Sequence, residues 1–281
     1  MLRVSHSKPC GEQALKFLSP IILVGLNLLS FWPAQSFASP WAQGDNELFI
    51  SSRVNYFRAT GDFLSSTPGQ ASDIFERIET DTYAEYGLTD KYTISAKAVF
   101  GSSTIRNSFE IQQASGLSEL EGYIQRQLWG SERAAGAISI IGALPSRFET
   151  GVLPGIETDG ASLGVRFLYG RTLIAGPRKV VATVETDYRR RFGDAADQSR
   201  VDFTLGVEAT PKISLLLQSF NQLSLRNAQN DGVDFDIYKV APSAVWHGGR
   251  RWSLQAGAIY EYAGRNVPTG TTFFLGLWTR F

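Results

Sequence analysis

Apolar and polar residues alternate along many short segments of this chain. In the clearest segment, 199–209, every second residue is apolar from Val201 to Val207, and the residues between are polar, charged or glycine. Segments 179–191 and 252–262 follow the same pattern. A period of two is typical of a β-strand with one apolar face. No comparably long stretch has helical periodicity, so the pattern predicts an all-β protein.

The same criterion, applied to the whole chain, predicts twelve strands. Their predicted ranges are 47–60, 74–88, 92–102, 117–129, 135–145, 160–171, 179–191, 199–209, 213–224, 234–246, 252–263 and 271–281. Two of these strands fit the pattern less well. Segment 117–129 has Arg126 on its apolar side, and segment 213–224 contains a run of three leucines.

The predicted connections alternate between short and long. The short ones are 89–91, 130–134, 175–178, 210–212 and 247–250, and the long ones are 61–73, 103–116, 146–159, 192–198, 225–233 and 264–270. Transmembrane barrels have short periplasmic turns and longer extracellular loops, and an even strand count places both termini in the periplasm. The pattern therefore predicts a twelve-stranded antiparallel transmembrane β-barrel.

The N-terminal residues predict export. Basic residues precede an uncharged, largely apolar stretch at 17–32, and Ser36-Phe37-Ala38 fits a cleavage site. The alternative, a transmembrane helix, is disfavoured because the stretch is shorter than a span and contains Pro20. We therefore expect residues 1–38 to be a signal peptide and residues 39–281 to be the barrel domain. The one cysteine, Cys10, would leave with the signal peptide.

Aromatic residues are grouped at the ends of the predicted strands, as expected at the two interfaces of a membrane. One group lies beside the short turns: Tyr86, Tyr92, Trp129, Trp246, Trp252 and Phe281. The other lies near the long loops: Tyr56, Phe100, Tyr188, Tyr260, Tyr262 and Phe273. Phe273, Leu275, Leu277 and Phe281 also share one phase of the last strand, and they resemble the C-terminal signal by which outer-membrane barrels are recognised for assembly. Thr279 departs from that signal.

Two segments resemble a known family. Residues 41–44, Trp-Ala-Gln-Gly, and residues 85–90, Glu-Tyr-Gly-Leu-Thr-Asp, are similar to the proteobacterial outer-membrane barrels linked by name to the meta pathway of phenol degradation. The resemblance is clearest over residues 41–100. It implies a barrel and the passage of small, aromatic or hydrophobic solutes, and it assigns no functional residue. Apart from this resemblance, residues 85–90 contain a glycine and an aspartate, which favour a tight turn between two strands.

Charged residues share the polar phase of the strands, and in an apolar-outward barrel they would line the lumen. They are Arg53, Arg77, Glu79, Asp81, Glu85, Lys97, Glu119, Glu121, Arg166, Glu185, Asp187, Arg189, Asp202, Glu208 and Glu261, together with Lys239 and Arg280. Buried charges must be paired or hydrated. The set therefore predicts either a narrow polar conduit or a salt-bridge network that fills the barrel. Alternation alone also permits a soluble barrel with its apolar face inward.

Three loop features suggest further sites. Segment 146–159, with Arg147, Phe148, Glu149 and Leu153, is apolar enough to fold inward as a constriction, although a solvated cap is the simpler alternative. Residues 189–191 are three consecutive arginines that could bind lipopolysaccharide phosphates, with a solvated strand end preferred. The acidic segment 231–236 is a weak match to a calcium loop because it lacks the EF-hand spacing.

Composition and chemistry argue against other classes of protein. Equal numbers of basic and acidic residues, 27 each, exclude a basic nucleic-acid binder. His247 is the one histidine after residue 38, and a serine hydrolase is disfavoured because this residue lies in a predicted periplasmic turn. We expect neither an enzyme nor a cofactor. The expected protein is a narrow outer-membrane channel for small solutes in a Gram-negative bacterium. Its partners would be outer-membrane lipid, lipopolysaccharide and the barrel-assembly machinery. A non-conducting structural or surface-binding barrel and a soluble periplasmic binding protein are the alternatives.

Overall fold

A computed structural model describes residues 39–62, 74–106, 111–145, 147–148, 160–230 and 232–281. Twelve long strands form the wall of a closed antiparallel barrel. Their bounds are β1 Leu48–Asp62, β2 Ile74–Gly87, β3 Tyr92–Arg106, β4 Ile111–Gly130, β5 Ala134–Leu144, β7 Ser162–Ile174, β8 Val180–Arg191, β9 Gln198–Thr210, β10 Ile213–Ser224, β11 Asp236–His247, β12 Trp252–Arg265 and β13 Pro268–Arg280. The prediction of twelve strands is confirmed, including the two that fitted the pattern less well.

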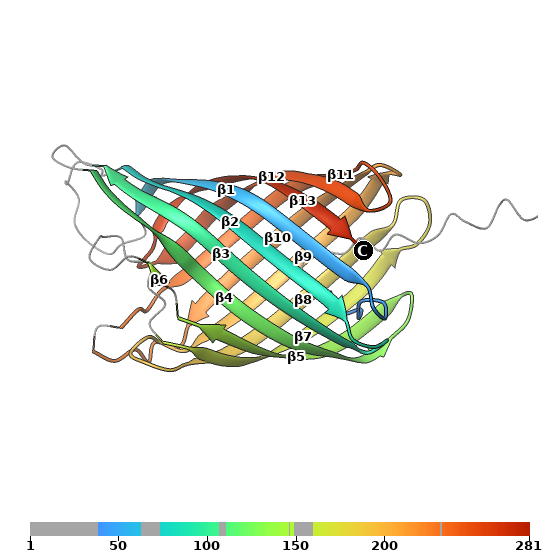
Figure 1. Cartoon of the computed structure of the whole chain (residues 1–281), viewed down its shortest axis with the longest axis horizontal. Coiled ribbons are helices and arrows are strands. Elements are labelled where there is room, and N and C mark those ends of the chain that lie inside the picture. The colour runs from blue at the N-terminus through green and yellow to red at the C-terminus, as the bar shows by residue number, and fades with distance from the viewer. Residues whose placement is uncertain (1–38, 63–73, 107–110, 146, 149–159, 231) are drawn as a thin grey trace, which may run out of the picture. The chain divides into compact units, whose positions relative to one another are not determined.

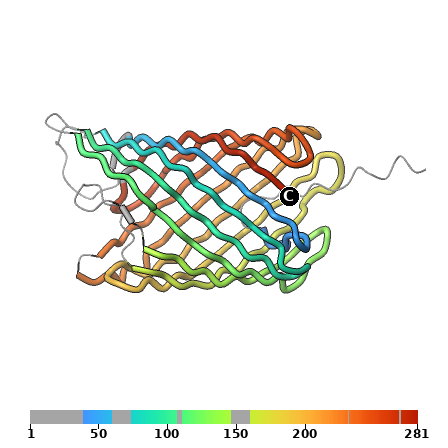
Figure 2. Tube along the Cα trace, in the orientation of Figure 1, coloured from blue at the N-terminus to red at the C-terminus, as the bar shows by residue number. Residues whose placement is uncertain are grey.

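Pairing of the first and last strands closes the sheet. Each long strand pairs with its neighbours in sequence, and β1 pairs with both β2 and β13. The β1–β13 register runs from Phe49 opposite Arg280 to Asp62 opposite Pro268. Figure 1 shows the strands crossing obliquely around the barrel. The beginning of β1 and the C-terminus lie at the same end of the barrel, the end with the short turns (Figure 2).

The outer face of the barrel is apolar. Large side chains such as Val54 (54% exposed) and Ile78 (56%) point away from the lumen, whereas the polar residues Asn55 and Asp81 of the same two strands are buried. A soluble barrel with an apolar interior would show the opposite arrangement, so that alternative is wrong. Closure also leaves the wall without an unpaired edge, as the interior of a bilayer requires. Among the residues that the structure describes, no helix is long and apolar enough to span a bilayer.

Exposed aromatic side chains lie toward both ends of the strands. At the short-turn end, Trp246 and Trp252 pack edge to face with their ring centroids 5.3 Å apart, and Trp129 lies 6.0 Å from Tyr169. At the other end, Tyr238 and Tyr262 are 6.3 Å apart. All four members of the predicted C-terminal signal, Phe273, Leu275, Leu277 and Phe281, point outward as well.

The predicted alternation of short and long connections is not strict. Segments 103–116 and 264–270 were expected to be loops, but β3 continues to Arg106, β4 begins at Ile111, and Asn266 and Val267 alone separate β12 from β13. Asn266 adopts a left-handed conformation (φ 57°), which is well tolerated by asparagine and permits a tight turn. Both expectations were wrong because polar strand ends that extend beyond the apolar belt resemble loops in sequence.

Candidate functional site in the barrel lumen

The predicted lumen charges occupy the inward phase of their strands. Those with buried side chains are Asp81, Glu85, Glu121, Arg166, Glu185, Asp187, Arg189 and Glu261. Those that are partly buried are Arg53, Arg77, Glu79, Lys97, Glu119, Asp202, Glu208, Lys239 and Arg280. Burial inside a closed barrel requires each charge to have a partner or water.

Several inward charges pair with a neighbouring strand. Arg53 on β1 lies directly opposite Asp81 on β2, and its Nη2 is 2.5 Å from Oδ2 of that carboxylate. Lys239 and Glu261 are opposite each other on β11 and β12, with Nζ 3.0 Å from Oε1. These pairs follow the strand register, so the sequence phase and the order of strands are sufficient to explain them.

A larger ionic network joins β4, β7 and β8. The Arg166 guanidinium lies 2.9 Å from Oδ2 of Asp187 and 3.3 Å from Oε2 of Glu185. Arg189 forms ion pairs with Asp187 at 3.5 Å and with Glu121 on β4. We call Glu121, Arg166, Glu185, Asp187 and Arg189 the ionic bar.

The Arg189–Glu121 contact does not join adjacent strands, because β5 and β7 lie between β4 and β8. The Arg189 side chain therefore reaches toward Glu121 past the inner surface of two strands. Gly164 on β7 is directly opposite Arg189, and a Cβ added there would lie 3.0 Å from Arg189 Cγ. The missing side chain at Gly164 leaves room for this path, so the ionic bar occupies space inside the lumen as well as its wall.

Aromatic rings lie against arginines on a different part of the lumen wall. The guanidinium carbons of Arg53, Arg77 and Arg280 lie 5.1, 5.9 and 5.7 Å from the ring centroids of Phe274, Phe57 and Phe49, respectively. All six residues belong to the three consecutive strands β13, β1 and β2. We call these six residues the aromatic–arginine wall; such stacked pairs are favourable cation–π contacts.

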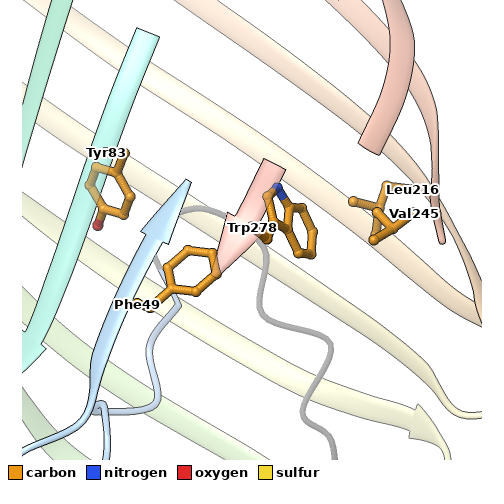
Figure 3. Close-up of a cluster of buried hydrophobic side chains, with 5 residues drawn as sticks. All are labelled: Phe49, Tyr83, Leu216, Val245 and Trp278. Carbon is orange, nitrogen blue, oxygen red and sulfur yellow. The ribbon is translucent and has the colours of Figure 1, made fainter. Parts of the chain in front are cut away.

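An apolar cluster also projects into the lumen. Figure 3 shows Phe49, Tyr83, Leu216, Val245 and Trp278, which come from five different strands and are all buried. The Phe49 and Trp278 rings meet edge to face at 6.0 Å. The alternation pattern does not predict these inward apolar residues, because it places apolar side chains on the outer face. Leu216, the middle residue of the leucine run, is the clearest case: its two neighbours are exposed and it is buried.

At the long-loop end, Asp197 links the connection between β8 and β9 to the connection between β10 and β11 by hydrogen bonds. Its carboxylate accepts hydrogen bonds from the Arg191 backbone N–H (2.9 Å), Asn227 Nδ2 (3.0 Å) and the Tyr188 hydroxyl (3.1 Å). Burial alone would raise the pKa of Asp197, but these hydrogen bonds, first that from Arg191, hold the pKa below its ordinary value. The carboxylate form is thus the form that stabilises the connection.

This connection predicts a pH-dependent loop. A lowered folded pKa means that the stabilisation is fully present above the unfolded pKa of about 4 and is lost as pH falls through the lower folded value. We expect the protection factors of the amides in 192–197 and 225–230, the intrinsic exchange rate divided by the observed rate at each pH, to fall over that acidic range in the native chain. In Asp197→Asn these protection factors should already be low at neutral pH and should change little on acidification. Equal pH dependence in both proteins would contradict this role.

The three arginines at 189–191 do not form one basic surface. Strand alternation buries Arg189 and Arg191, and only Arg190 is exposed, with its Nη1 3.5 Å from Oδ2 of Asp197. For Arg189 and Arg191, both the lipopolysaccharide-binding cluster and the preferred solvated strand end are therefore wrong, because these two side chains are buried. In the acidic segment 231–236, the Arg265 guanidinium binds both Asp234 and Asp236, and residue 231 lies outside the described residues.

The predicted constriction segment is described in part. Arg147 and Phe148 form a two-residue strand, β6, that pairs with Gly116 and Leu117 of β4. Glu149, Leu153 and the rest of 149–159 lie outside the described residues, so the constriction stays a prediction. Residues 1–38, the predicted signal peptide, also lie outside them.

His247 points inward at the short-turn end. Its Nε2 is 2.9 Å from Ser214 Oγ, and its Nδ1 is 3.0 Å from Ser253 Oγ. A catalytic triad needs one ring nitrogen on the nucleophilic serine and the other on a carboxylate. Serine hydroxyls at both nitrogens are a poor match to that arrangement.

Comparison with solved structures identifies the fold. The COG4313 outer membrane channel from Pseudomonas putida F1 aligns with a TM-score of 0.69 and 11% identity, covering 90% of this chain and 100% of that one. The NanC porin aligns with a TM-score of 0.53 and 9% identity, covering 82% of this chain and 98% of that one. No protein-family model and no curated protein sequence matches the chain. The fold is thus that of outer-membrane β-barrels, and the resemblance to the phenol meta-pathway barrels stays a prediction.

Proposed function

We propose that this protein is a narrow outer-membrane channel for small solutes. The observation that carries the proposal is the contrast between an apolar outer face and a lumen rich in charged side chains. A purely structural barrel gains little from buried ion pairs, because desolvation offsets much of their attraction. The two similar folds described above belong to proteins named as a channel and a porin, and this supports the same role here.

The proposal places the barrel in the outer membrane, exported by residues 1–38, with its short turns in the periplasm. The exposed aromatic residues at both strand ends suit the two lipid interfaces. Outer-membrane lipid and lipopolysaccharide would surround the barrel, and Phe273, Leu275, Leu277 and Phe281 would present the signal to the assembly machinery. The geometry around His247 argues against a serine hydrolase.

The aromatic–arginine wall supports a preference for small aromatic or hydrophobic solutes over sugars. The Phe274, Phe57 and Phe49 rings are at most 6% exposed and lie against arginines, so a planar solute would stack on them by displacing a guanidinium group. The ionic bar lies on other strands and would limit the size of what passes. A solute would therefore pass along the aromatic–arginine wall, beside the ionic bar.

Conductance in a planar lipid bilayer tests the channel. We expect small, discrete conductance steps from the purified native protein, and we expect Glu121→Gln to change both the step size and the preference between cations and anions. The control is Glu76→Gln, because Glu76 lies near the long-loop end and hydrogen-bonds the exposed Tyr56. A correctly folded protein without conductance steps would favour the alternative of a non-conducting structural or surface-binding barrel.

A further inference from the structure

Residues 39–43, which precede β1, are buried or half-buried although they belong to no strand, whereas residues 44–47 are exposed. Ser39 and Gln43 are 6% and 4% exposed, and Pro40 is fully buried. These residues precede Leu48, where β1 begins at the short-turn end. An irregular segment outside a barrel wall would be solvated, so its burial indicates that it lies against the inner surface of the barrel.

Inward side chains of β3 and β4 hold the backbone of this segment, and one of β2 holds a side chain. Thr93 Oγ1 on β3 accepts a hydrogen bond from the Gln43 backbone N–H at 3.1 Å, and Gln127 Oε1 on β4 accepts one from the Ala42 N–H at 2.6 Å. Gln125 Nε2, also on β4, donates to the Ser39 carbonyl at 2.7 Å. The Gln43 side chain donates to Glu85 on β2 at 2.8 Å.

The segment continues past these strands to β7. Trp41 donates its indole N–H to the Ser131 carbonyl, in the turn between β4 and β5, at 3.0 Å. A Cβ built on Gly170 of β7 would lie 2.5 Å from the Trp41 ring and 2.7 Å from Pro40 Cγ. From the start of β1 to Gly170 on β7, the segment therefore crosses β2, β3, β4 and β5, four of the twelve long strands.

We propose that residues 39–44 form a strap that closes the short-turn mouth of the lumen, and that a solute passes only when the strap detaches from the inner surface of the barrel. This inference rests on the proposed channel function. Hydrogen bonds to side chains hold the strap, whereas a ladder of backbone hydrogen bonds holds each strand of the wall. Each such bond contributes little net stability, because water can replace it when the strap detaches. The strap can consequently detach at far lower cost than any strand.

Variants at two separate contacts test the strap. Gly170→Val places a side chain where Trp41 and Pro40 now lie, and the double variant Gln125→Ala/Gln127→Ala removes two hydrogen bonds to the strap backbone. Gly276→Ala and Gln218→Ala are the matched controls. Both control residues are inward-facing and lie away from the strap, and a Cβ at Gly276 meets no atom closer than 3.5 Å.

Single-channel recordings in planar bilayers, in potassium chloride, give the readout. We expect both strap variants to raise the mean conductance at least about twofold, with the controls unchanged. A gel shift between unheated and boiled samples confirms that each variant is folded. If a variant at one contact fails to fold, the variant at the other contact decides.

The possible outcomes separate the two hypotheses. If the native protein and all folded variants conduct equally, the channel exists and the strap proposal is wrong. If neither the native protein nor a folded strap variant conducts, the channel itself is wrong, and the strap with it. Conductance that rises in the strap variants alone supports both.

Discussion

Replacing Arg189 with methionine is expected to destabilise the barrel by about 3–5 kcal/mol, the cost of breaking a buried ion pair from one side. The Arg189 side chain is buried, and it neutralises both Glu121 and Asp187. Removing the guanidinium leaves Glu121 with a hydrogen bond from the Tyr123 hydroxyl and with Arg200, whose nearest nitrogen is 4.0 Å away. Methionine has a similar length and flexibility, so most of the cost is electrostatic. Urea unfolding of the protein in detergent micelles, followed by tryptophan fluorescence, measures this change.

Arg190→Met is the matched control for that experiment. Its side chain is 63% exposed, and its ion pair with Asp197 is a surface contact worth about 0–1 kcal/mol. The two variants remove the same group from neighbouring positions on opposite faces of β8. Similar unfolding free energies for the two would show that Arg189 does not neutralise buried carboxylates.

The second large effect concerns the outer face. Leu217 lies near the middle of β10 and is 51% exposed, so Leu217→Arg would place a charge against the hydrocarbon of a bilayer. An arginine at the midplane of a barrel costs about 2–4 kcal/mol, and one near the interface costs about 0–1 kcal/mol. Ile213→Arg provides the control, because Ile213 faces outward at the short-turn end of the same strand. Unfolding from lipid vesicles by guanidinium gives both free energies. Equal tolerance of the two arginines would contradict a lipid-facing belt.

Most of the wall could be predicted because strand geometry relates sequence directly to position. Successive side chains point to opposite faces, so alternation in segment 199–209 identifies both the strand and its inward residues. The same rule explains why consecutive arginines at 190 and 191 lie on opposite sides of the wall. The leucine run at 215–217 shows the limit of this rule. Alternation places Leu216 on the opposite face from Leu215 and Leu217, but three apolar side chains do not indicate which face is the inner one.

Contacts across the lumen could not be predicted. The alternation of side chains along each strand places Glu121 and Arg189 on the inner face. It does not indicate that these two charges form a pair, because two strands lie between them. The strap could not be predicted for a different reason: residues 39–44 have neither an alternating pattern nor a charge cluster, and the side chains that bind their backbone are those of uncharged glutamines and a threonine. The end of β12 and the beginning of β13 could not be predicted because their residues lack the apolar alternation of a strand. Both strands nevertheless extend to the tight turn at Asn266.

Heat-modifiability in an isolated outer-membrane fraction tests the central claim, a closed barrel resident in that membrane. Unheated and boiled samples are compared side by side in a detergent gel. The closed barrel predicts that the protein is found with the outer membrane and that the unheated band migrates faster than the boiled one. A single unshifted band in the soluble periplasmic fraction would contradict the account, and with it the channel.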